Sequence, residues 1–243
     1  MKLKKPAVLS ALFLFFSCGI QEYYYLPQVP ESYITSSLTD SATIRIPSIS
    51  SEYYYATNYS IFYRIYISGE NLTSIQTTDM NSINPALTGD YTWFLGYTDT
   101  SSTSVTTLNT FKSRNYYEIE LDGEAIADIF SKNGGTLRIL FPTSPGSYPS
   151  VSLNGGAEIR LRRSGELTSP LPLDDPFFRN TNELNNNANA TNLINADVAA
   201  GRTGIAQRFA YVSMYIVARG KDGFSSIFGK PTHINIFKLP DIN

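Results

Sequence analysis

The chain of 243 residues contains one cysteine and one histidine. A single cysteine excludes a disulfide within the chain and a zinc site built from several thiolates. A single imidazole excludes a histidine-rich metal site and leaves His233 as the only candidate base of a catalytic triad. Because no G-x-S-x-G turn supplies a nucleophile for it, we expect His233 to be a structural or surface residue.

Charge is also scarce, since charged residues make up only 16% of the chain. The 19 Lys and Arg nearly balance the 21 Asp and Glu, which gives a net charge of −2 at pH 7. A nucleic-acid partner would favour a clear basic excess, so we expect none. The segment Gly223–Gly229 departs from the spacing of a phosphate-binding loop, and Asp174 and Asp175 lack the spacing of a calcium loop. We therefore expect no cofactor and no metal.

No apolar run is long enough to cross a bilayer as a helix. The run Ala7–Phe16 has about ten residues, interrupted by Ser10, whereas a spanning helix needs about 20. Three lysines precede it, namely Lys2, Lys4 and Lys5. A positive segment followed by a short apolar run is typical of an export signal, so residues 1–17 are predicted to be a signal peptide.

The end of this run, Phe15-Phe16-Ser17-Cys18-Gly19, resembles the relaxed lipobox of spirochaetal bacterial lipoproteins. The resemblance implies cleavage between Ser17 and Cys18 and attachment of diacylglyceryl and fatty acyl chains, such as palmitate, at Cys18. Two or three acyl chains anchor a protein stably where one does not. An ordinary secreted protein, in which Cys18 is a bystander, is the alternative interpretation.

If Cys18 is lipidated, residues 18–35 form a tether, because Pro27 and Pro30 favour extended backbone. The alternative for this segment is an edge strand of the folded domain. We expect residues 36–243 to form that domain and its partner to be the membrane, through the lipid anchor. Since Gly19 is not acidic, the cell outer membrane is favoured over the inner one.

The rest of the chain shows the alternation of apolar and polar residues that is typical of strands. The longest apolar segment, 211–219, is expected to be a central strand. One helix is expected over 123–132 and a second short one near residue 200, while the Asn-rich segment 180–195 has loop composition. The other expected strands are 42–47, 59–68, 91–97, 116–121, 136–141, 157–162 and 232–239. This pattern predicts an all-β antiparallel sandwich with long insertions.

Two segments carry a resemblance to a known fold family. Val212–Ala218, followed by a short hairpin and Gly229–Ile234, is similar to the last two strands of a fibronectin type III domain, and Tyr63–Tyr66 is similar to its third strand. The resemblance covers about a third of the chain and implies an immunoglobulin-like sandwich. It also implies a role in binding or spacing rather than catalysis.

Tyrosine is abundant, and it is favoured at recognition surfaces because it offers a large contact area at low entropy cost. The candidate binding surface is Tyr53, Tyr54, Tyr55, Tyr116 and Tyr117, although tyrosine also suits half-buried strands. We predict a non-catalytic binding or spacer module, adhesin-like or antigen-like, with a protein or a glycan as ligand. The alternatives are a glycan-acting enzyme, for which Glu118 and Glu120 could form an acid pair, and a structural accessory of an envelope complex.

Overall fold

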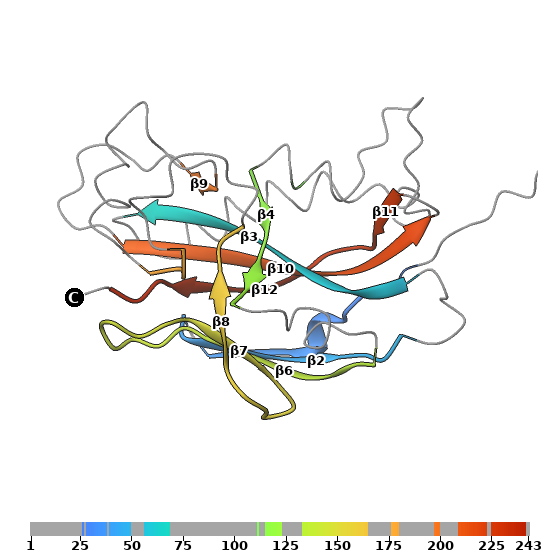
Figure 1. Cartoon of the computed structure of the whole chain (residues 1–243), viewed down its shortest axis with the longest axis horizontal. Helices are drawn as coiled ribbons and strands as arrows, with labels where there is room; N and C mark the ends of the chain where they lie inside the picture. The colour runs from blue at the N-terminus through green and yellow to red at the C-terminus, as the bar shows by residue number, and fades with distance from the viewer. Residues whose placement is uncertain are drawn as a thin grey trace, which may run out of the picture.

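The computed structural model describes residues 26, 28–37, 39–49, 56–68, 111, 115–122, 133–164, 176–179, 197–199, 209–222 and 225–241. Across these residues the chain forms two sheets that pack face to face (Figure 1). The strands pair antiparallel except for β9 (Val198–Ala199), which runs parallel to β3 (Ala56–Ser68). The predicted all-β antiparallel sandwich is confirmed. Within the described part of the chain, no helix is long and apolar enough to span a membrane.

The first sheet has the order β1-β2-β6-β7-β8-β5. Its inner face follows from the alternation in the sequence, as in β2, where Ala42, Ile44 and Ile46 are buried while Thr43 and Arg45 are exposed. The strands are β1 (Ile34–Ser37), β2 (Ser41–Ile46), β5 (Glu120–Leu121), β6 (Gly135–Leu140), β7 (Ser150–Leu153) and β8 (Ile159–Arg162).

The second sheet is organised around β10 (Phe209–Asp222), which pairs along its length with β3. On its other side β10 pairs first with β12 (Thr232–Lys238) and then with β11 (Ser225–Phe228). The central position predicted for 211–219 is therefore confirmed. It explains why every residue from Val212 to Ala218 is buried, since β10 is covered on both faces.

One edge of the sandwich is closed by a strand that changes sheets. β4 (Tyr117–Glu118) pairs with β3, and Ile119 still donates its N–H to Ile61 O at 2.9 Å. The next two residues form β5 and pair with β8 of the other sheet (Figure 1). The prediction of one strand over 116–121 is thus correct in conformation, but this strand is divided between the two sheets.

The opposite edge is bridged by the segment before β1. Leu26 and Val29 are buried in the main core, and Thr232 donates its hydroxyl to Val29 O. Further along, Lys238 N donates to Thr39 O at 3.0 Å. The 3-10 turn η1 (Glu31–Tyr33) then leads directly into the edge strand β1. Residue 26 and residues 28–35 therefore belong to the folded body, and the boundary expected at residue 36 falls inside β1.

The core has two parts. The main cluster fills the space between the sheets, with the inward residues of β2, β3, β6 and β10 at its centre. A second cluster lies on the other face of β3 and β10, and its members are Phe62, Phe111, Tyr116, Tyr215, Val217 and Phe228. Phe62 and Phe111 stack there with ring centroids 4.6 Å apart. The second sheet therefore buries apolar residues on both of its faces.

Several predicted features lie outside the described residues: the signal peptide, Cys18, the strand 91–97, the helix 123–132 and the Asn-rich segment 180–195. Four described strands were not predicted, namely β1, β7, β9 and β11. Each has four residues or fewer, so its alternation is too short to stand out. Val198 and Ala199 form β9, so the short helix expected near residue 200 is not found at these two residues.

Candidate functional site

Two of the five tyrosines of the predicted binding surface, Tyr116 and Tyr117, lie among the described residues. Tyr53, Tyr54 and Tyr55 lie outside the described residues. Tyr116 is 1% exposed in the outer aromatic cluster, with its ring 5.3 Å from Phe111 and 5.7 Å from Tyr215. The prediction that Tyr116 lies on a binding surface is wrong, because aromatic neighbours cover its ring. Tyr117 is half-buried against the main core.

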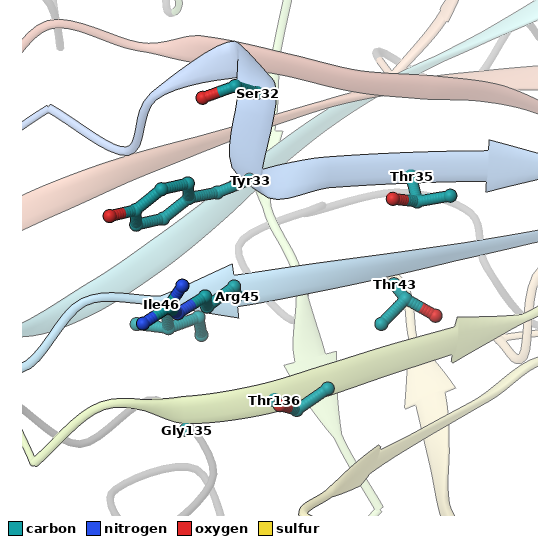
Figure 2. A pocket seen from close by; sticks show the side chains of 8 residues that line it. All are labelled: Ser32, Tyr33, Thr35, Thr43, Arg45, Ile46, Gly135 and Thr136. Carbon is teal, nitrogen blue, oxygen red and sulfur yellow. The ribbon is translucent and has the colours of Figure 1, made fainter.

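A groove lies instead on the outer face of the first sheet (Figure 2). It has a volume of about 540 Å³ and is formed where η1 and β1 run beside β2 and β6. Four of its lining residues carry aliphatic hydroxyls: Ser32, Thr35, Thr43 and Thr136. Hydroxyls both donate and accept hydrogen bonds, so this lining suits a polar ligand.

Arg45 and Tyr33 give the groove its charge and its aromatic surface. The guanidinium of Arg45 lies 5.1 Å from the centroid of the Tyr33 ring, a cation–π contact between β2 and η1. The strand register produces the arrangement, since Arg45 pairs with Thr136 and Thr43 pairs with Thr35. Arg45 is exposed, so its donors are open to solvent.

A second basic and aromatic group lies near the opposite edge of the same sheet, around β8. Arg160 and Arg179 lie 4.2 Å and 4.1 Å from the centroid of the Tyr148 ring. Phe177 meets Tyr148 edge-on at 5.4 Å, and Arg162 lies 5.8 Å from the Phe177 ring. The Nε atom of Arg162 is buried without a hydrogen-bond partner. Delocalised guanidinium groups suit such stacking better than ammonium groups do.

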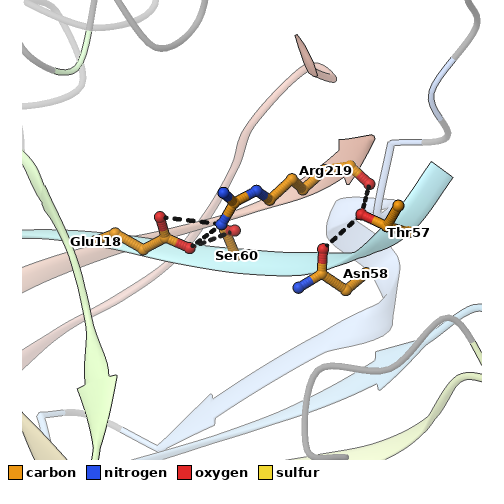
Figure 3. A network of polar contacts seen from close by, with 5 residues as sticks. All are labelled: Thr57, Asn58, Ser60, Glu118 and Arg219. Atoms are coloured by element: carbon orange, nitrogen blue, oxygen red, sulfur yellow. Dashed lines mark hydrogen bonds and ion pairs between the residues drawn. The ribbon is translucent and has the colours of Figure 1, made fainter. Parts of the chain in front are cut away.

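Glu118 does not form an acid pair with Glu120. Glu118 accepts hydrogen bonds from Ser60 Oγ at 2.7 Å and from Arg219 at 3.1 Å and 3.4 Å (Figure 3). Thr57 joins the same network by donating to Arg219 O at 3.3 Å (Figure 3). Glu120 lies in the other sheet, opposite Arg162. The two carboxylates therefore have separate basic neighbours.

A buried ion pair joins separate parts of the chain. Arg163 donates to Asp197 through Nε at 2.8 Å and Nη2 at 2.6 Å. Tyr63 donates its hydroxyl to Asp197 at 2.9 Å and accepts from Ser164 N at 2.9 Å. Phe178 covers the group with its ring 4.6 Å from Tyr63. Burial, more than the neighbouring Asp197, raises the pKa of Tyr63 well above 10.0. Because its groups are enclosed and paired with one another, this network is a structural feature of the interior, not an accessible site.

His233 lies on β12, half-buried, with Nε2 3.3 Å from Ser213 Oγ and its ring 4.9 Å from Tyr215. The structural role expected for it agrees with these contacts. Among the residues that the structure describes, no group of three or more His, Cys, Asp or Glu side chains could hold a metal ion.

Sequence reasoning missed the residues of both basic groups. A signal for them was present, because Arg45, Arg138, Arg160 and Arg162 stand at alternating strand positions while strands β2, β6 and β8 contain no acid. Comparison of the chain with protein-family models, with curated proteins and with solved structures gives no match.

Proposed function

We propose that the chain is a lipid-anchored bacterial envelope protein whose β-sandwich is a non-catalytic binding module. The observation that carries the proposal is the position of the single cysteine. Cys18 closes the apolar run of the predicted export signal, and only seven residues separate it from Leu26, which is buried in the sandwich. Eight Cα–Cα steps of extended chain reach at most about 28 Å. Acyl chains on Cys18 would hold the sandwich close to the bilayer.

The place where the chain enters the sandwich agrees with this arrangement. A Cβ atom added at Gly229 would lie 3.1 Å from Leu26 Cβ, so the first described residue packs closely against the link between β11 and β12. Gln28 donates to Thr232 Oγ1 at 3.2 Å in the same region. The anchored end would therefore be the end at which β11 lies, at the right of Figure 1.

The exposed groove and the aromatic–arginine contacts support binding as the role of the sandwich. The groove is open, lined by hydroxyls and carries one exposed cation, which suits recognition of a polar partner. β10 pairs with β3 on one side and with the last strand, β12, on the other, with β11 inserted between β10 and β12 in the chain. This order supports the resemblance to fibronectin type III domains, in which the third strand and the last two strands are neighbours.

Metabolic labelling with a fatty acid tests the anchor. The wild type should carry the label and Cys18→Ala should not, because the thiol is the acceptor. Ser17→Ala is the matched control, since it keeps a small residue before the cleavage site and should still be labelled. Equal labelling of the wild type and Cys18→Ala would refute the proposal. Protease treatment of whole cells then distinguishes a surface-exposed protein, which is degraded, from one that faces the periplasm.

A further inference from the structure

The strands of the first sheet have an unusual charge distribution. Five of its six strands, β1, β2, β6, β7 and β8, contain the arginines Arg45, Arg138, Arg160 and Arg162 and no Asp, Glu or Lys, while the edge strand β5 contributes Glu120 opposite Arg162. The chain as a whole has a net charge of −2. The basic residues of this sheet are therefore concentrated on one face of a slightly acidic protein, where they create a locally positive potential.

Three of these arginines form a line across the outer face, which we name the arginine row: Arg45 on β2, Arg138 on β6 and Arg160 on β8. Their inner-face neighbours Ile44, Leu137 and Leu161 are fully buried, so the arginines point away from the core. All three are exposed. The register places Thr43 opposite Arg138 and Ser150 opposite Arg160. With ordinary strand spacing and rise, the row extends over about 20 Å.

Among the residues that the structure describes, no acidic side chain forms an ion pair with an arginine of the row. Within the part of the chain that the structure describes, the ion pairs join Arg163 to Asp197 and Arg219 to Glu118, and none includes a residue of the row. Glu158, which accepts from Ser150 Oγ at 3.0 Å, is an exposed acid near the Arg160 end. The row therefore has donors available for external anions.

Both ends of the row are aromatic. Arg45 lies against Tyr33 at 5.1 Å and Arg160 lies against Tyr148 at 4.2 Å. Hydroxyls line the groove beside Arg45, as Figure 2 shows for Thr35, Thr43 and Thr136. Aromatic faces and hydroxyls match the C–H faces and hydroxyls of sugar rings, and guanidinium groups bind carboxylate or sulfate through two parallel hydrogen bonds.

We propose that the outer face of the first sheet binds an acidic glycan, a sugar chain with carboxylate or sulfate groups, along the arginine row. The proposal names the ligand class of the binding module proposed above and rests on that function. A length of about 20 Å suits a chain of several sugars better than a single small anion. An anionic membrane surface would also attract the arginines, but it would not require the hydroxyl-lined groove beside Tyr33.

The test uses the full-length acylated protein, immobilised in a neutral amphipol. The probes are polygalacturonate, neutral dextran, and nanodiscs made with or without phosphatidylglycerol. The protein should bind polygalacturonate in a salt-dependent manner and should not bind dextran. The double variant Arg45→Gln/Arg138→Gln should bind polygalacturonate about tenfold more weakly or worse.

Two further variants separate specific recognition from net charge. Lys221→Gln/Lys230→Gln removes the same charge from exposed positions on the second sheet and its connection, so its affinity should be nearly unchanged. Tyr33→Leu keeps the net charge and should weaken glycan binding, because it removes the aromatic surface and the hydroxyl. Thermal melting of each variant shows whether it remains folded.

Three results would overturn the inference. The first is no binding to polygalacturonate, and the second is an equal loss of affinity in the lysine control. The third is an absence of glycan binding together with binding to phosphatidylglycerol nanodiscs that the Tyr33→Leu variant retains. The last result would assign the row to the membrane surface. Fatty-acid labelling of Cys18 in the same preparations is independent of these readouts. A labelled protein without glycan affinity would refute the ligand class alone.

Discussion

Arg163 and Asp197 form a two-pronged ion pair, and their side chains are 2% and 0% exposed. The pair joins the end of β8 to the residue that precedes β9. Asp197 also accepts from Tyr63 on β3, and its carbonyl oxygen accepts from Ile65 N at 2.9 Å. Asp197 thus holds two connections against the central part of the second sheet, through its carboxylate and its backbone carbonyl.

Asp197→Asn should destabilise the protein strongly. The change keeps the shape of the side chain but leaves the charge of Arg163 buried without compensation, which costs about 3–5 kcal/mol. Urea denaturation followed by fluorescence measures the free energy of unfolding. The control is Glu118→Gln, because the Arg219–Glu118 pair is 32% and 37% exposed and such pairs contribute about 1 kcal/mol or less. Equal losses in the two variants would contradict the role given to burial.

Replacement of the whole pair should be milder than removal of one partner. Arg163→Met/Asp197→Leu removes both charges and fills similar volume, and such exchanges are often neutral or stabilising. Tyr63 and Ser164 would then keep their mutual hydrogen bond at 2.9 Å. We expect the double variant to unfold at a higher urea concentration than Asp197→Asn, and the reverse order would contradict the argument.

The stability of the protein should fall in alkaline solution above pH 10. Burial raises the pKa of Tyr59 and of Tyr63 above 10.0, the value that applies to the unfolded chain. Below pH 10 both phenols are neutral in the folded and in the unfolded chain, so their contribution to the stability of the folded chain is fully present. As the pH rises further, the unfolded chain loses these protons while the folded chain keeps them, so unfolding becomes easier.

The pH dependence can be isolated with Tyr59→Phe and Tyr63→Phe, measured by urea denaturation between pH 8 and pH 11. Each variant should lose stability less steeply with pH than the wild type, because a buried phenol that resists ionisation is gone. Tyr117→Phe, which changes a half-buried ring, is the control for a general effect of removing a phenol. Identical slopes in the wild type and both buried-site variants would refute this account.

The limits of sequence reasoning are visible in β4 and β5. Alternation over 116–121 correctly indicates extended backbone, but it cannot show that Glu118 pairs with Phe62 in one sheet and Glu120 with Arg162 in the other. Only tertiary packing decides where a strand leaves its sheet. The same limit applies to Tyr116, since one of the rings that cover it belongs to Tyr215, which is distant in sequence.

Only part of the candidate site could be predicted from the sequence. Alternation predicts that Arg45 and Arg160 face solvent, because Ile44 and Leu161 mark the inner face. That these arginines share one face follows from the strand order β2-β6-β7-β8, which is set by long-range pairing. The contact of Arg45 with Tyr33 depends in addition on the turn η1, which no alternation of apolar and polar residues indicates.

Phe111→Ala should cost about 3–5 kcal/mol of folding free energy, the usual range for removing a buried aromatic ring. Phe111 is 1% exposed and stacks on Phe62, so truncation would leave a cavity on the outer face of the second sheet. Tyr148→Ala is the matched control, because this ring is only half-buried. Chemical denaturation of the two variants gives the comparison. Equal small effects would show that the outer aromatic cluster is not a second core.

Alanine substitutions at Gly134 and Gly155 distinguish the energetic cost of backbone strain from that of steric contact. Their φ angles are +75° and +72°, a region that side chains disfavour, so alanine at either site should cost about 1 kcal/mol. At Gly134 the new Cβ would also lie 2.6 Å from Ser48 N and 2.8 Å from Ile46 O, whereas at Gly155 it would meet nothing within 4 Å. Backbone atoms cannot rotate away as a side chain can, so Gly134→Ala should lose a further 1–3 kcal/mol or so. Thermal unfolding of both variants under the same conditions measures the difference. Equal melting temperatures would mean that the loop before β6 can move away from β2, and the close approach at Ile46 would then not contribute to the stability of the sheet.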